Sequence, residues 1–175
     1  MATTPFSKLA YKTLQQSKSI AGLAHKELST KLMELVAPEA VPSTQAVSPE
    51  LLKDLRSSMA QLEERDWEEA QQGTYPESQL FDAPWLDWAS RYPLVWLDLP
   101  STWNRRRERN VRDLPDDTDR SLFPEYYLQN FHHQTDGYLS DHSAGLYDLQ
   151  VEILFNGTAD AMRRRVLAPL KRGLN

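Results

Sequence analysis

The sequence contains no cysteine and no long apolar run. Without cysteine the chain forms neither disulfides nor thiolate zinc sites, and a cysteine nucleophile is excluded. With no sign of a secreted disulfide scaffold, a cytoplasmic location is expected. The longest apolar stretch, residues 94–97, is far shorter than the ~18 residues that a membrane span needs, so no membrane span is expected.

Glycine is also scarce. The six glycines stand at positions 22, 73, 137, 145, 157 and 173, and no two are closer than eight residues. A phosphate-binding loop needs closely spaced glycines, because only a backbone without side chains can approach the phosphates. The sequence therefore predicts no nucleotide-type cofactor site of the Walker or Rossmann kind within this chain.

The charge balance is acidic, with a net charge of −5 at pH 7, which argues against a general nucleic-acid surface. Residues 1–26 carry four lysines and no acidic residue, as an organelle transit peptide would, but they lack arginine. A run of arginines between 105 and 112 could clamp a phosphate or an acidic partner. Four aspartates follow between 113 and 119, so pairing within the chain is the simpler interpretation.

Apolar residues recur every three or four positions through residues 1–36, which predicts one long amphipathic helix. Gly22 inside it suggests a break or a close contact. Residues 37–48 contain two prolines and read as a linker. Ser48 and Pro49 then begin a second helix that ends near Gly73. Its acidic half, residues 63–69, is interpreted as a solvated face.

Prolines interrupt the middle of the chain between residues 75 and 122, so only short helices are expected there, the clearest at 84–91. This stretch also holds four of the five tryptophans. Such rings are usually packing anchors, and the alternative is a surface for another domain.

In the last third of the chain we expect a short helix at 124–130, followed by a polar turn. A helix after Ser140 is expected to reach Phe155, and Thr158 is expected to cap a final helix. The predicted fold class is all-α: an irregular helical assembly with a proline-broken aromatic middle. The expected organisation is a helix over 1–36, a linker over 37–48 and a helical domain over 49–175, which could be the N-terminal part of a larger enzyme.

A polar turn gathers several side chains that could bind a ligand. Three histidines and two aspartates lie within residues 132–142, but they match no recognised metal motif, and a hydrogen-bonded turn is the simpler interpretation. Ring faces next to hydrogen-bonding groups are typical of the wall of a small-molecule pocket. The candidate substrate-binding residues are Tyr126, Tyr127, Phe131, His132, His133, Gln134 and Asp136. No catalytic or metal-binding residue is predicted.

The segment from Tyr126 to Leu170 reads YYLQNFHHQTDGYLSDHSAGLYDLQVEILFNGTADAMRRRVLAPL. It resembles the segment preceding the catalytic domain in class I S-adenosylmethionine-dependent methyltransferases of cyanobacteria and plastids. The likeness is looser in the proline-containing middle, and residues 1–72 do not contribute to it. The chain departs from the family pattern at His133 and Tyr138, where the family has tyrosine and tryptophan.

The resemblance implies a helical substrate-side or cap region that is not catalytic by itself. S-adenosylmethionine would bind a glycine-rich turn in a Rossmann domain following Asn175, and that domain and a small-molecule substrate are the implied partners. The candidate wall would lie over the mouth of the methyl-transfer site, with His132 and Asp136 orienting substrate. The alternative function is a free-standing helical protein-interaction module that uses the tryptophan-rich middle and the acidic second helix.

Overall fold

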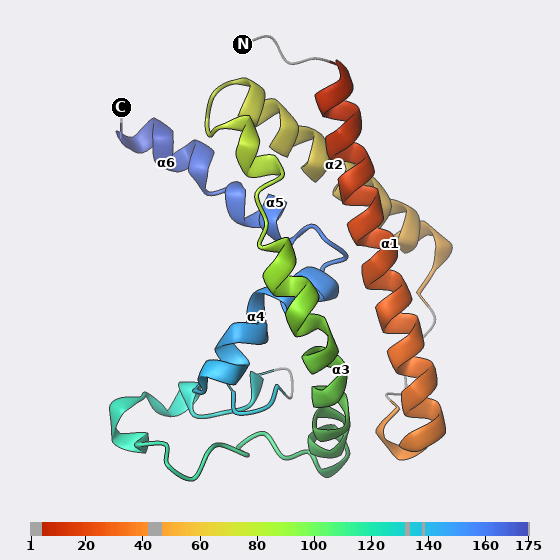
Figure 1. Cartoon of the computed structure of the whole chain (residues 1–175), viewed down its shortest axis with the longest axis vertical. Coiled ribbons are helices and arrows are strands. Elements are labelled where there is room, and N and C mark those ends of the chain that lie inside the picture. The colour runs from red at the N-terminus through yellow and green to blue at the C-terminus, as the bar shows by residue number, and fades with distance from the viewer. Residues whose placement is uncertain (1–4, 42–46, 132–133, 138, 175) are drawn as a thin grey trace. The chain divides into compact units, whose positions relative to one another are not determined.

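The computed structural model describes residues 5–41, 47–131, 134–137 and 139–174 (Figure 1). Its α-helices are α1 (Pro5–Val36), α2 (Pro49–Gln71), α3 (Trp85–Glu108), α4 (Asp141–Leu154), α5 (Ala159–Arg164) and α6 (Leu167–Leu174). Short 3₁₀ helices lie at Pro38–Ala40, Glu77–Leu80, Arg120–Leu122 and Glu125–Tyr127. No strand occurs within these described ranges, and the predicted all-α class is confirmed.

The chain divides into two compact units that interleave along the sequence. Unit 1 comprises Met1–His25, Thr44–Pro84 and Glu152–Asn175, and unit 2 comprises Lys26–Ser43 and Trp85–Val151. The helices α1 and α4 each contribute to both units.

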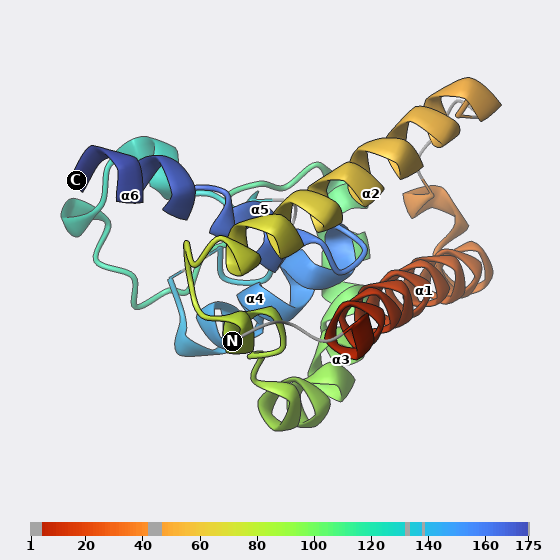
Figure 2. The ribbon, with the colours of Figure 1, turned by 90° about the horizontal axis from the view of Figure 1, so that it is seen from above.

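The core of unit 1 is assembled from distant parts of the chain. Tyr11 of α1 lies 5.9 Å from Trp67 of α2, ring centroid to centroid, and Tyr75 and Leu80 complete the buried cluster. In Figure 2, α5 lies beneath the C-terminal half of α2, and the two helices are in contact. Leu167 at the start of α6 packs against the same cluster.

The predicted start of α2 is confirmed. The Ser48 hydroxyl accepts a hydrogen bond from the Leu51 backbone N–H at 3.1 Å, and Pro49 occupies the first turn. Gly22 marks a close contact within an unbroken α1. A Cβ at this position would lie 3.2 Å from both Asn156 Cα and the Ile153 carbonyl oxygen.

The expected breaks in the middle of the chain are wrong, because α3 runs for 24 residues through Pro93 and Pro100. Both prolines lie on the exposed side of the helix, where water can hydrate the carbonyl groups that lose their N–H partners. The opposite side buries Trp88, Val95 and Trp103, and this packing offsets the lost hydrogen bonds.

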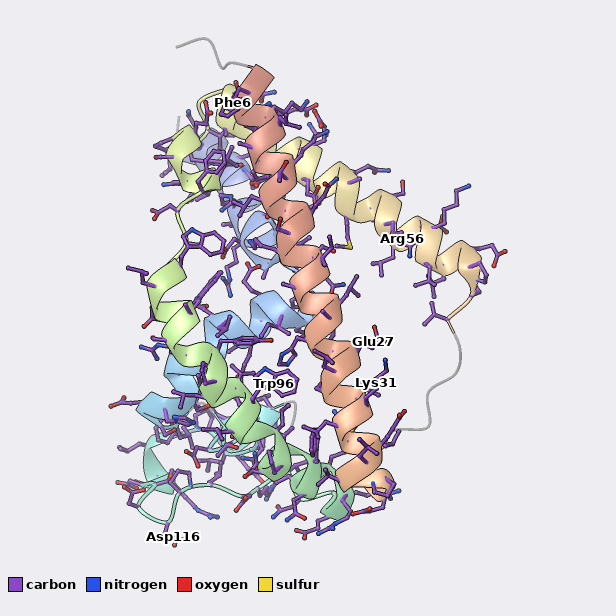
Figure 3. All side chains as sticks on the ribbon, turned by 45° about the vertical axis from the view of Figure 1, so that its right-hand side comes forward. Phe6, Glu27, Lys31, Arg56, Trp96 and Asp116 are labelled. Atoms are coloured by element: carbon purple, nitrogen blue, oxygen red, sulfur yellow. The ribbon has the colours of Figure 1, made fainter. Side chains whose placement is uncertain are left out.

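The tryptophans of the middle do not share one environment. Trp88 and Trp103 are buried, Trp96 (labelled in Figure 3) is half-buried, and Trp85 is exposed. Trp103 packs with Met33 in the core of unit 2. The packing-anchor interpretation therefore holds for Trp88 and Trp103.

Candidate functional site

Four aromatic rings follow one another in unit 2, and we call Phe123, Tyr126, Tyr127 and Phe131 the aromatic row. Phe123 stacks on Tyr127 with centroids 5.8 Å apart and an interplanar angle of 15°. Tyr126 meets Tyr127 edge-on at 6.5 Å, and Phe131 lies 6.2 Å from Tyr127. Tyr126 is 71% exposed. The structure brings together three predicted wall residues and adds Phe123, which lies before Pro124 and outside the predicted short helix.

Asn130 joins the C-terminal end of the aromatic row to the backbone of residues 111–113 by hydrogen bonds. Its Oδ1 accepts a hydrogen bond from the Asp113 N–H at 2.7 Å, while its Nδ2 donates to the Asp113 carbonyl at 2.8 Å. The Asn130 backbone N–H donates to the Val111 carbonyl at 2.8 Å. The buried amide thus pairs with both backbone groups of Asp113, which would otherwise need water.

Gln134, a predicted site residue, is buried and joins the turn to α4. Its Nε2 donates to the Ser143 carbonyl at 3.2 Å and to Gln150 Oε1 at 2.9 Å. The Gln134 carbonyl in turn accepts from Asn130 Nδ2 at 3.0 Å. These bonds give Gln134 a structural role in joining the turn to α4, and its direct contact with a substrate stays a prediction.

Asp136 orders the beginning of α4. Its Oδ2 accepts from the Ser140 hydroxyl at 2.9 Å, and the Ser140 oxygen accepts from the Ser143 N–H at 3.1 Å, so Ser140 caps α4 as expected. Gly137 follows with φ +61°, and a Cβ there would lie 2.8 Å from the Gln129 carbonyl oxygen. Only glycine fits this position without moving the backbone.

Three residues of the predicted turn, His132, His133 and Tyr138, lie outside the described residues. His142 of α4 is exposed. In the ranges that the structure describes, no three histidine, aspartate or glutamate side chains gather as metal ligands would.

A buried carboxylate that the sequence did not reveal stands at the centre of unit 1. Asp66 is fully buried. Its Oδ1 accepts from the Tyr75 hydroxyl at 2.6 Å and from Arg164 Nε at 2.9 Å. Its Oδ2 accepts from the Tyr11 hydroxyl at 2.7 Å and from Arg164 Nη2 at 2.7 Å. We call these four residues the Asp66 network.

Four donor atoms surround the Asp66 carboxylate, which offers about four acceptor positions, and the single Tyr75 hydroxyl proton is shared between Oδ1 and the Asp66 backbone carbonyl, also 2.6 Å away. Burial alone would raise the pKa of Asp66, but the hydrogen bonds from Arg164 and the two tyrosines outweigh it and lower that pKa. Burial and the adjacent carboxylate raise the pKa of both Tyr11 and Tyr75. Near neutral pH Asp66 therefore stays ionised and both tyrosines stay protonated, and the network stabilises the fold of unit 1.

The interpretation of residues 63–69 as a solvated face is wrong for Asp66 and Glu69. Both are buried, and Glu69 pairs with Arg165. Asp66 falls four residues after Leu62 and seven after Met59, so it lies on the apolar face of the helix. This spacing predicts that Asp66 is buried, but it does not predict which residues donate hydrogen bonds to its carboxylate.

The predicted Thr158 cap is also wrong. The Thr158 hydroxyl donates to the Phe155 carbonyl and makes no cap bond. The carboxylate of Glu152 instead accepts from the Asp160 backbone N–H at 2.7 Å. Burial raises the pKa of Glu152, although Lys18 Nζ lies 3.1 Å from its Oε2 and partly opposes the shift.

The arginine run pairs within unit 2, as the simpler interpretation expected. Arg105 is buried and lies 3.5 Å from Asp113, the one following aspartate that pairs with the run among the described residues. Arg107 pairs with Glu39 at 3.0 Å, and Arg112 pairs with Glu125 at 3.2 Å.

Comparisons with known protein families, with curated proteins and with solved structures find no match. No helix in the described part of the chain is both long and apolar enough to cross a membrane.

Proposed function

We propose that this chain is the helical, substrate-side region of a class I S-adenosylmethionine-dependent methyltransferase, and that the aromatic row contacts the methyl acceptor. The resemblance of residues 126–170 to the segment preceding the catalytic domain in that family supports the proposal. The observation that carries it is the aromatic row itself, which presents the exposed Tyr126 beside stacked rings at the start of the resembling segment.

The aromatic row suits binding better than acid–base chemistry. Ring faces contribute apolar contact area, and phenol groups add polar tips that fix the orientation of a ligand. Asn130 and Gln134, which precede and follow Phe131 in the sequence, bind the backbone there to residues 113 and 143, which orders this end of the row before a ligand arrives. The most buried carboxylate among the described residues, Asp66, is enclosed by donors from Arg164 and two tyrosines that lower its pKa, so it is poorly suited to take up a substrate proton.

In this proposal the methyl donor binds a partner domain. Class I methyltransferases hold S-adenosylmethionine beside a parallel sheet, at a glycine-rich turn that opens a helix, as Rossmann-type folds do. The glycines of this chain are too widely spaced for that turn. The partner domain would supply the cofactor, and the chain would supply the wall opposite it.

The coding sequence beyond Asn175 and calorimetry with S-adenosylmethionine test the proposal together. We expect the reading frame to continue into a strand, a glycine-rich turn and a helix, and we expect the longer protein to bind the cofactor when residues 1–175 do not. Micromolar binding by residues 1–175 would overturn the assignment. A reading frame without a Rossmann segment would also overturn it and would favour the protein-interaction module.

A further inference from the structure

An apolar groove of about 450 Å³ lies between α1 and α2, entirely within unit 1. Leu23 of α1 and Leu52, Leu55 and Met59 of α2 line it. Leu23 and Leu55 are 53% and 51% exposed. Large apolar side chains that stay exposed together mark a surface where another apolar face packs.

Two unpaired charges flank the groove. Arg56 (labelled in Figure 3) and Glu63 both line it, seven residues apart on α2, which is two helical turns or about 10.5 Å. Neither side chain makes a hydrogen bond or an ion pair within the described ranges. Burial raises the pKa of Glu63, and the attraction of Lys12 and Lys18 only partly opposes this rise. The groove therefore offers one unmatched charge of each sign at opposite ends of an apolar stretch.

We propose that this groove is a self-association surface that receives α2 of a second copy of the chain, aligned antiparallel. Arg56 and Glu63 are equally distant from the midpoint between Met59 and Ala60. A two-fold axis at that midpoint places Arg56 opposite the partner's Glu63, and Glu63 opposite the partner's Arg56. The same two ion pairs form on both sides of the axis, as an isologous interface requires.

The apolar residues support a second copy as the occupant. Leu51, Leu52 and Leu55 project from the N-terminal half of α2 and remain exposed, and Leu52 and Leu55 also form one wall of the groove. The same surface therefore carries leucines that can insert into a partner's groove and a groove that can receive the partner's leucines. This inference is independent of the proposed function, since it concerns unit 1 and the aromatic row belongs to unit 2.

Charge reversal tests the pairing. We expect the wild-type chain to dimerise in analytical ultracentrifugation, and Arg56→Glu and Glu63→Arg each to weaken self-association by about tenfold or more, because each places like charges opposite one another twice. An equimolar mixture of the two variants should dimerise again, because the acidic face of one variant then meets the basic face of the other. The matched controls Lys53→Glu and Glu68→Arg make the same charge changes at exposed positions of α2 outside the groove lining, and they should associate as the wild type does.

A disulfide tests the position of the axis, because the chain has no cysteine of its own. Ala60→Cys should cross-link two copies rapidly under mild oxidation, since this residue lies beside the proposed axis. Gln61→Cys, also exposed but turned about 100° around the helix, should cross-link much more slowly. A wild-type chain that is monomeric at every concentration overturns the proposal. So do charge variants that associate as the wild type does, or a Gln61→Cys variant that cross-links as fast as Ala60→Cys.

Discussion

The Asp66 network and the aromatic row lie in different units and are built in different ways. The Asp66 network is buried, charged and assembled from α1, α2 and α5, so it forms only when three distant segments meet. The aromatic row is partly exposed, and the polar contacts beside it are made by the neutral amides of Asn130 and Gln134. The first arrangement stabilises unit 1, and the second presents a surface on unit 2 that a ligand can reach.

The largest expected effect is the loss of the Asp66 carboxylate. Asp66→Ala leaves the largely buried Arg164 without its counter-charge, and breaking such an ion pair costs about 3–5 kcal/mol of unfolding free energy. Urea denaturation measures it. In the double variant Asp66→Leu with Arg164→Met no unpaired charge remains, so stability should partly recover. A double variant less stable than Asp66→Ala would show that the unpaired charge of Arg164 is not the cause of the stability lost in Asp66→Ala.

A smaller loss is expected from the neutral amide of unit 2. Asn130→Ala removes the buried amide that pairs with the N–H and carbonyl of the exposed Asp113, and losing these two hydrogen bonds costs about 1–3 kcal/mol. The same urea titration measures this loss, with Gln72→Ala as an exposed amide control. If Asn130→Ala lowers the unfolding free energy as much as Asp66→Ala does, the proposed difference between the charged Asp66 network and the neutral Asn130 amide is contradicted.

The Asp66 network should also make stability depend on acid pH. Because the folded pKa of Asp66 is lowered, its contribution is fully present above the unfolded pKa of about 3.9 and is lost as pH falls through the folded pKa. Glu152 works in the opposite direction, since its raised folded pKa makes protonation favourable to the folded state.

Urea midpoints measured from pH 6 down to pH 2 test this dependence. The wild type should lose stability toward the acid end more steeply than Asp66→Asn, which cannot titrate at this position. Parallel curves would show that Asp66 does not contribute to acid sensitivity.

Local signals in the sequence located most of the helices. The spacing of apolar residues and the Ser48–Pro49 start gave α1 and α2 nearly their observed bounds, because capping and periodicity are properties of neighbouring residues. The continuation of α3 through Pro93 depends on packing against the rest of unit 2, and the Asp66–Arg164 pair joins residues 98 positions apart. Interactions at that separation leave no trace in local spacing. Tyr126 and Tyr127 could be chosen as wall residues from local composition, whereas Phe123, only four residues before Tyr127, was missed because it lies before Pro124 and outside the predicted short helix.

The most direct test of this account compares Tyr126→Ala with Asp66→Asn in the full-length methyltransferase that the proposed function requires. Tyr126 is exposed, so its replacement should change the unfolding free energy by only about 0.5 kcal/mol while lowering kcat/KM, because a ring face that contacts the methyl acceptor is removed. Asp66→Asn should lower the melting temperature and leave kcat/KM of the folded enzyme unchanged. If Tyr126→Ala retains full kcat/KM, or if Asp66→Asn lowers kcat/KM of a fully folded enzyme, the division between a stabilising network and a substrate-facing row is contradicted.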